Sequence, residues 1–373
     1  MLLSKKCLLK CLPRQRLARV ACCFVWTLFF CAVISYASTA LKLNGRDVGL
    51  ATSAGGLAKV NKDYPAIVTT LSTVPCDSEC RRFQRLMAQW PRDKPKAALV
   101  YLVHRFGYLE TSIRSVGNYF CHKFDYPIII FHEADFFNVA DMTKDVLLEA
   151  AVMNSSRVFF QLIEFKTPKF LPKPVPGQME IPCFSSIGYR HMCRFQAKGV
   201  FEQPVIKELE YMWRLDDDSE LLAPVTYDVF RFMHNRHLDY GYVWRHLDAF
   251  DCVTGLWDAA REFLDKSKIK PQFFDRWSNP YLFYNNFEVS RLSVWLSADY
   301  RSYVDYIDSK GGIYYHRWGD APIKGIAVSI FIPENRTHFF TDMKYRHGSF
   351  VNGQTNAIHV RWYNENPRIG SVL

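Results

Sequence analysis

Stretches of strand and helix character alternate through the middle of this chain. Short apolar runs rich in β-branched and aromatic residues occupy residues 97–103, 126–131 and 157–163 and are typical of buried strands. Between them, residues 109–120 and 142–152 carry apolar side chains at helical spacing. This alternation predicts a parallel α/β sheet. In such sheets ligands bind beyond the carboxyl ends of the strands, near the point where the strand order reverses.

The pattern continues in the second half of the chain. Residues 192–200 and 203–210 have helical character and lead into a fourth strand at 211–215. Residues 300–310 predict a further helix, which Gly311 and Gly312 end. A short apolar element follows at 326–332.

The fourth strand ends in three consecutive carboxylates, Asp216, Asp217 and Asp218. Like charges this close repel one another, and a cation among them removes the repulsion. Mg²⁺ and Mn²⁺ take oxygen ligands from carboxylates and from substrate phosphates. An acidic turn that caps a helix is the alternative. The position after a strand of an α/β sheet favours a metal site for a phosphorylated substrate.

The N-terminal segment has the charge pattern of a signal anchor. Residues 1–19 contain six basic residues and no acidic one, and residues 20–36 are uncharged and mostly apolar. We expect a cytosolic tail at 1–19, a single membrane-spanning helix at 20–36 and a lumenal remainder, as in a type II membrane protein. A cleaved signal peptide, with small residues at 37–40, is the alternative.

The lumenal part divides into a turn-rich stem at 37–95, with a helix near residues 79–90, and a catalytic domain at 96–373. The formal net charge of +10 falls to about +4 without the six basic residues of the tail. Because the excess charge sits in that tail, the composition argues against nucleic acid as a partner.

Cysteine usage fits an oxidising compartment. Six cysteines follow the predicted span, which allows up to three disulfides. Cys76 and Cys80 are close enough in sequence for a local bridge. The six are Cys76, Cys80, Cys121, Cys183, Cys193 and Cys252.

Several motifs together resemble the fungal Golgi α-1,2-mannosyltransferases, glycosyltransferase family 15. They are Ser-Ile-Arg-Ser-Val at 112–116, Tyr-Arg-His-Met-Cys-Arg-Phe at 189–195, the run 211–218, Asn-Phe-Glu-Val at 286–289, the run 311–322 and His-Phe-Phe at 338–340. The resemblance implies a nucleotide-diphospho-sugar transferase fold of the GT-A type, with a mixed, mostly parallel central sheet flanked by helices. It also implies a Golgi membrane location.

The resemblance implies Mn²⁺ as cofactor. A carboxylate of the strand-end motif and a later histidine hold the metal in the family, which correspond to Asp216 and His347, with Asp218 as the other motif carboxylate. This chain departs from the family, which has glutamate at the position of Asp216 and proline at that of Asp217. With the shorter Asp216, direct contact by Asp218 and a water-mediated contact by Asp216 is the alternative arrangement.

Two further residues match positions that the family places in its active site. Glu288 corresponds to a proposed nucleophile, and Tyr189 to a tyrosine near donor phosphate or acceptor. Transfer with retention needs either a carboxylate on the far face of the sugar or front-face attack by the acceptor. Glu288 also has the chemistry to hydrogen-bond the donor sugar or the acceptor.

The resemblance also suggests residues that contact the nucleotide sugar. Arg105 follows the first strand and is the expected contact to phosphate or base. Arg194, Arg214 and Asp217 lie in matching motifs and are expected beside the donor. Arg317 and Asp320 are expected to pair with each other and brace their loop. Nearby aromatic side chains are either core or sugar-stacking residues: Tyr281, Phe283, Tyr284, Tyr314, Tyr315 and Trp318.

These expectations describe a retaining transferase that moves mannose from GDP-mannose to a mannose hydroxyl, in α-1,2 linkage, on a mannosylated glycan of a glycoprotein or on a polysaccharide. Two alternatives stay open: the same fold with another nucleotide-sugar donor, and a catalytically inactive glycan-binding protein. The retained Asp216, Asp218 and Glu288 argue against the inactive protein.

Overall fold

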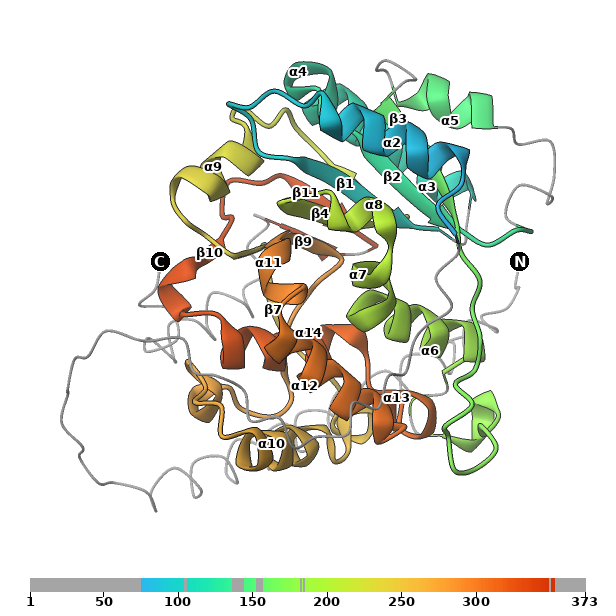
Figure 1. Cartoon of the computed structure of the whole chain (residues 1–373), viewed down its shortest axis with the longest axis vertical. Coiled ribbons are helices and arrows are strands. Elements are labelled where there is room, and N and C mark those ends of the chain that lie inside the picture. The colour runs from blue at the N-terminus through green and yellow to red at the C-terminus, as the bar shows by residue number, and fades with distance from the viewer. Residues whose placement is uncertain are drawn as a thin grey trace, which may run out of the picture. The chain divides into compact units, whose positions relative to one another are not determined.

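A seven-stranded mixed sheet forms the centre of the fold (Figure 1). The computed structural model describes residues 75–352 apart from 104–105, 136–143, 152–156, 182, 184 and 349. The strand order is β10-β6-β9-β4-β1-β2-β3, and only β9 runs antiparallel to its neighbours. The strands are β1 (Ala97–Leu102), β2 (Ile128–His132), β3 (Val158–Leu162), β4 (Tyr211–Asp216), β6 (Tyr240–Tyr242), β9 (Phe287–Arg291) and β10 (Thr337–Phe339). The expected mostly parallel α/β sheet is confirmed.

Two small sheets accompany the central one. The first has the order β12-β11-β5 and is antiparallel, and the second pairs β7 with β8. Their strands are β5 (Ser219–Leu221), β7 (Arg245–Leu247), β8 (Tyr281–Phe283), β11 (Tyr345–His347) and β12 (Phe350–Val351).

Helices cover the sheet in two groups. In Figure 1, α2, α3 and α5 lie beside β1, β2 and β3 at the top, and α14, α12 and α10 follow one below the other in the lower half. The main helices are α2 (Ser78–Ala88), α3 (Phe106–Val116), α5 (Lys144–Ala150), α6 (Ile187–Arg194), α7 (Val200–Glu202), α8 (Pro204–Lys207), α9 (Val229–Asn235), α10 (Leu256–Ser267), α11 (Leu292–Trp295), α12 (Ala298–Ser309), α13 (Gly312–Tyr315) and α14 (Asp320–Phe331). Two π-helical turns, η1 (Gly117–Cys121) and η4 (Phe195–Gly199), continue α3 and α6.

The acidic run lies where the strand order of the sheet reverses. Strand β1 is almost wholly buried and has β2 on one side and β4 on the other. Leu102, at the end of β1, pairs with Asp216, at the end of β4. The chain therefore reverses its strand order between β1 and β4, the position at which open α/β sheets bind ligands.

The folded unit begins N-terminal to residue 96. Helix α2, expected near residues 79–90, packs on β3 through an edge-to-face contact between Phe83 and Phe159, and Arg82 donates a hydrogen bond to the Val158 carbonyl. The predicted tail, the predicted span and residues 37–74 of the predicted stem lie outside the described residues. Among the described residues, no helix combines the length and the hydrophobicity of a membrane span.

The apolar run 326–332 is the end of a longer helix, α14, of twelve residues. Ten of these residues are buried. A helix that is apolar all round has little amphipathic period, which is why the sequence pattern shows only a short apolar element.

Two of the three possible disulfides are present. Cys76 and Cys80 form the expected local bridge, and Cys183 bridges to Cys252. Cys121 and Cys193 are free thiols buried in the core, so the full set of three bridges does not form.

Candidate active site

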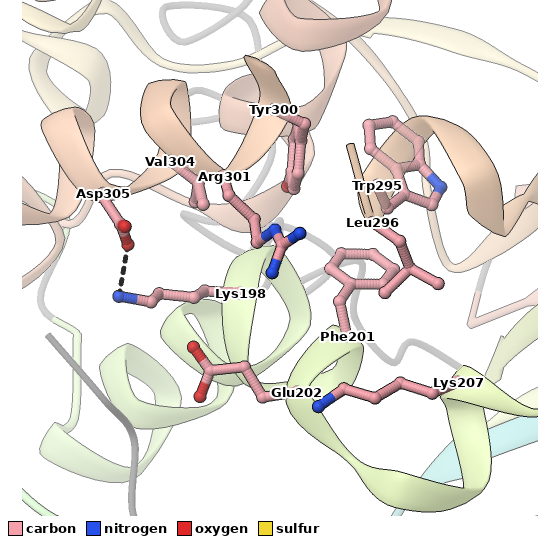
Figure 2. A pocket seen from close by; sticks show the side chains of 10 residues that line it. All are labelled: Lys198, Phe201, Glu202, Lys207, Trp295, Leu296, Tyr300, Arg301, Val304 and Asp305. Carbon is pink, nitrogen blue, oxygen red and sulfur yellow. Dashed lines mark ion pairs between the residues drawn. The ribbon is translucent and has the colours of Figure 1, made fainter. Parts of the chain in front are cut away.

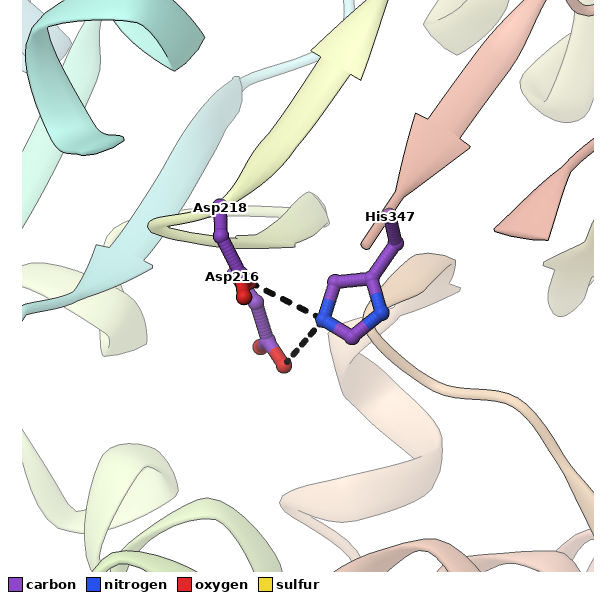
Figure 3. Close-up of side chains that lie close together, drawn as sticks. All are labelled: Asp216, Asp218 and His347. Atoms are coloured by element: carbon purple, nitrogen blue, oxygen red, sulfur yellow. Dashed lines mark ion pairs between the residues drawn. The ribbon is translucent and has the colours of Figure 1, made fainter. Parts of the chain in front are cut away.

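Asp216, Asp218 and His347 form a cluster at the end of β4 (Figure 3). His347 Nε2 lies 3.0 Å from Asp218 Oδ1 and 3.8 Å from Asp216 Oδ2. Strand β5 follows the acidic run and pairs with β11, so that Ser219 is opposite His347. This pairing brings a histidine near the C-terminus to carboxylates in the middle of the chain.

The cluster fits a divalent metal ion. One ligand atom from each residue lies within 4.8 Å of the others, and all three side chains are partly exposed. Two carboxylates and an imidazole are a donor set that suits Mn²⁺ and leaves coordination positions for substrate. Burial lowers the pKa of His347, but its hydrogen bond with Asp218 and the charges of both carboxylates outweigh it and raise the pKa. The three residues therefore already attract positive charge.

Asp217 lies outside this cluster. Its side chain is buried, whereas its neighbours Asp216 and Asp218 are partly exposed on the side of His347. Asp217 and Asp218 form the turn between β4 and β5, and this turn buries the middle aspartate while the other two stay partly exposed. The structure thus brings together three of the four residues that the sequence grouped here, and the cluster consists of Asp216, Asp218 and His347.

Arg214, expected beside the donor, is enclosed by carboxylates. Its Nε and one terminal nitrogen donate to Asp216 Oδ1 at 3.2 and 3.0 Å, and its other terminal nitrogen donates to Asp320 Oδ2. Asn285 Nδ2 donates to the same oxygen of Asp320 at 2.9 Å. Burial works against ionisation of Asp320, but Arg214 prevails and lowers the pKa. Arg214 therefore holds one oxygen of Asp216 and leaves Oδ2 directed at His347.

The expected pairing of Arg317 with Asp320 is wrong, because each has another partner. Arg317 donates to the Tyr189 hydroxyl at 2.9 Å, and its guanidinium lies 4.7 Å from the centre of the Tyr189 ring. It also lies 3.5 Å from Asp248 Oδ1. The backbone of Arg317 has a φ of 63°, a strained conformation for a residue other than glycine. Cys193 and burial raise the pKa of Tyr189, so its phenol stays protonated.

Glu288 lies inside the core. It is in β9 opposite Arg214, and its side chain is 0% exposed. Lys324 Nζ of α14, also 0% exposed, lies 2.5 Å from Glu288 Oε1, and Ser290 donates to the same oxygen at 2.8 Å. Burial lowers the pKa of Lys324 although Glu288 opposes this. The carboxylate thus faces a buried ammonium group.

Arg194 is paired away from the metal cluster. It makes a two-pronged contact with the buried Asp308 at 2.7 and 2.9 Å. The neighbouring Lys198 lies 2.5 Å from Asp305. Lys198 and Asp305 line a cavity of about 270 Å³ (Figure 2). The cavity lies between η4, α7 and α8 on one side and α11 and α12 on the other. The cavity is lined by Lys198, Phe201, Glu202, Lys207, Trp295, Leu296, Tyr300, Arg301, Val304 and Asp305. The pairing with Asp308 is thus the structural explanation for the buried charge of Arg194.

The sequence analysis did not find two charged residues that pair with site residues: Lys324, the partner of Glu288, and Asp248, the partner of Arg317. Lys324 lies within an apolar helix, where an isolated lysine indicates a buried carboxylate partner. Asp248 shows no comparable signal, because its contact with Arg317 depends on two distant loops. The predicted phosphate contact Arg105 lies outside the described residues.

The fold and the cluster define an α/β protein with a candidate divalent-metal site at the switch point of its sheet. Residues 72–365 match the family model described as glycolipid 2-alpha-mannosyltransferase. The chain therefore belongs to this family.

Curated relatives agree with this assignment, and a solved structure shares the fold. The chain is 31% identical over 266 residues to the probable mannosyltransferase KTR3 of Saccharomyces cerevisiae, covering 65% of this chain. It is 30% identical over 282 residues to glycolipid 2-alpha-mannosyltransferase 1 of Candida albicans, covering 70% of this chain. The alignments span 64% of each relative's length. Core-mannan synthase A of Aspergillus fumigatus, solved in an Mn/GDP form, superimposes with a TM-score of 0.59 at 24% identity, covering 69% of this chain and 76% of that one.

Proposed function

We propose that this chain is an Mn²⁺-dependent mannosyltransferase that moves mannose from GDP-mannose to a mannose hydroxyl of a glycan, with retention and in α-1,2 linkage. The observation that carries the proposal is the cluster of Asp216, Asp218 and His347 at the switch point of the sheet. Family membership and the Mn/GDP form of the Aspergillus protein support the choice of metal and nucleotide.

Asp216, Asp218 and His347 would hold the ion. Bound there, Mn²⁺ supplies charge neutralisation for the diphosphate that leaves with the nucleotide. Asp218 has both carboxylate oxygens outside the Arg214 contact, whereas Asp216 offers mainly Oδ2. We therefore propose Asp218 as a direct ligand. Arg105 is proposed as a contact to the nucleotide.

The burial of Glu288 favours front-face attack over a covalent intermediate. A nucleophilic carboxylate must reach the anomeric carbon, and Glu288 is sealed against Lys324. In front-face attack the acceptor oxygen bonds to the anomeric carbon on the face from which the diphosphate oxygen departs. The proton of the acceptor hydroxyl passes to that departing oxygen and neutralises its new negative charge. Because bond formation and bond breaking occur on the same face, the anomeric carbon keeps its configuration. Tyr189, held by Arg317, is proposed to contact donor or acceptor.

The two disulfides support a lumenal location in the secretory pathway, because such bridges persist in oxidising compartments. We propose a Golgi membrane protein anchored through residues 20–36.

The test is incubation of the purified full chain with Mn²⁺, an α-mannoside acceptor and a panel of nucleotide sugars. We expect transfer from GDP-mannose only, with an α-1,2 product identified by linkage analysis. Transfer only from a uridine-linked sugar would contradict the donor. Glycan binding without transfer from any donor would contradict the enzymatic assignment.

A further inference from the structure

The ring nitrogen of His347 that faces away from the carboxylates has a specific partner. Tyr284 Oη lies 3.0 Å from His347 Nδ1, while Nε2 faces Asp218 at 3.0 Å. A neutral imidazole that binds a metal through Nε2 carries its proton on Nδ1, and that proton needs an acceptor. The Tyr284 oxygen is in the position to accept it.

Tyr284 is itself held in place by aromatic side chains. Trp244 and Phe350 stack with ring centres 4.1 Å apart and planes 4° apart. Both rings make edge-to-face contacts with the Tyr284 ring, whose centre lies 5.2 Å from that of Trp244 and 5.8 Å from that of Phe350. The Tyr284 backbone N–H also donates to the Trp244 carbonyl at 3.0 Å. The hydroxyl is therefore presented by a ring with little freedom to move.

The two residues after Tyr284 connect to the acidic run at the end of β4. Asn285 fixes Asp320, which in turn holds Arg214. The Asn286 carbonyl accepts from the Asp216 backbone N–H at 3.3 Å. The turn between β8 and β9, residues 284–286, thus touches every segment that supplies a proposed ligand, either directly or through one partner.

We propose that Tyr284 is a positioning residue that holds the His347 ring through Nδ1, so that the Nε2 lone pair is directed at the metal when the ion displaces the Nε2 proton. The inference rests on the proposed function, since it takes Asp216, Asp218 and His347 as the metal ligands. With the ion bound, the hydroxyl accepts a hydrogen bond from Nδ1–H, and without it the hydroxyl donates to Nδ1. The stacked rings of Trp244 and Phe350 keep that hydroxyl in line. His347 is thereby orientated before the ion arrives.

The test compares Tyr284→Phe with the wild type and with a matched control, Tyr315→Phe. The Tyr315 hydroxyl bonds the backbone of Lys173 instead of a site residue. Mn²⁺ affinity of the full chain is measured from the electron paramagnetic resonance signal of free Mn²⁺. Loss of an outer-shell partner typically weakens metal binding about 10–100-fold, and we expect that loss for Tyr284→Phe and none for Tyr315→Phe.

A second readout reports the histidine directly. Long-range ¹H–¹⁵N spectra show which ring nitrogen of His347 carries the proton, and diamagnetic Zn²⁺ serves as the ion. In the metal-free wild type we expect the proton on Nε2, which faces the Asp218 carboxylate. On addition of Zn²⁺ we expect the proton on Nδ1 in the wild type, and a mixture of both forms at the same Zn²⁺ concentration in Tyr284→Phe. Thermal unfolding of the metal-free variants checks that each is folded.

His347→Ala separates this inference from the proposed function. If His347→Ala weakens Mn²⁺ binding while Tyr284→Phe binds Mn²⁺ as tightly as the wild type, the role of Tyr284 is overturned and the metal site stands. If His347→Ala has no effect on Mn²⁺ binding, the assignment of His347 as a ligand is wrong, and the inference fails with it.

Discussion

Two charged pairs lie in the core behind the metal cluster, Arg214 with Asp320 and Lys324 with Glu288. Each removes ions from water, which is costly unless their partners compensate. Both pairs join α14 to the strands that carry the site, because Asp320 and Lys324 are one helical turn apart. The charge arrangement of the site thus depends on a helix that supplies no metal ligand.

The pair of Glu288 and Lys324 allows a stability test. Glu288→Gln leaves the Lys324 ammonium buried without its counter-ion, and we expect a loss of about 3–5 kcal/mol in the free energy of unfolding. Lys324→Met leaves the carboxylate unpaired and has a similar cost. The double variant removes both charges and recovers most of the loss, measured by denaturant titration. Strictly additive losses in the double variant would show that the two side chains are not coupled.

Among the individual site residues, the sequence predicted those that stand out in a local pattern. Asp216 and Asp218 are visible because three carboxylates end a strand. His347 was indicated only by resemblance, because its place depends on the pairing of β11 with β5. Lys324 and Glu288 are 36 positions apart, and no local pattern encodes such a contact.

Glycines mark the closest approaches between elements. A Cβ on Gly117, in the π-helical turn after α3, would lie 2.0 Å from the carbonyl oxygen of Ala151. A Cβ on Gly188, in α6, would have its nearest neighbour at 4.0 Å. The first glycine is therefore required by packing between elements, whereas the second is open to substitution.

Alanine at these two positions should have opposite effects. Gly117→Ala forces the turn away from Ala151, and overpacking of this kind costs about 1–3 kcal/mol. Gly188→Ala removes a flexible residue from a helix and gains up to about 1 kcal/mol. Thermal unfolding midpoints measure both. Equal midpoints for the two variants would contradict the close contact at Gly117.

His338, on strand β10, makes stability depend on pH. Its ring packs between Phe232 and Phe340 at 4.8 and 4.7 Å, and this burial lowers its pKa below the ordinary 6.5, with smaller effects from Asp342 and Arg236. The unfolded chain then binds a proton more readily than the folded protein, so stability is complete above pH 6.5 and is lost as the pH falls towards the lowered value.

Replacing His338 should therefore reduce the loss of stability in acid. We expect denaturant midpoints measured above and below pH 6.5 to differ less for His338→Gln than for the wild type. The comparison is made between pH values within each protein, which removes the cost of the substitution itself. An equal acid-induced loss in both proteins would exclude His338 as a contributor.

For the whole molecule, the sequence predicted the sheet better than its surroundings. Strands β1, β2, β3 and β4 have local signals, because strands buried on both faces are continuously apolar. Helix α14 was visible only in part, since it is buried nearly all round. The antiparallel β9 was unexpected as a strand, because Glu288 interrupts its apolar pattern and its counter-ion is the distant Lys324.

The two disulfides should contribute unequally to stability. Cys183 and Cys252 are 69 positions apart and Cys76 and Cys80 are four apart. Loop-closure entropy predicts about 4 kcal/mol for the longer loop and roughly 2 kcal/mol for the shorter one. Replacing both cysteines of each pair with serine and comparing unfolding free energies tests this difference. A larger loss on removing the short-range bridge would contradict the prediction.

The central claim is that Asp218 binds the metal that transfer requires. The most direct measurement is the Mn²⁺ dependence of mannose transfer from GDP-mannose by Asp218→Asn, compared with Asp258→Asn on the surface of α10, where the aspartate is 83% exposed. We expect Asp218→Asn to lose transfer activity by more than the roughly 10–100-fold that is typical when a residue that only supports a metal ligand is replaced. We expect the activity of Asp258→Asn to match that of the wild type. Transfer by Asp218→Asn with an unchanged requirement for Mn²⁺ would contradict the claim.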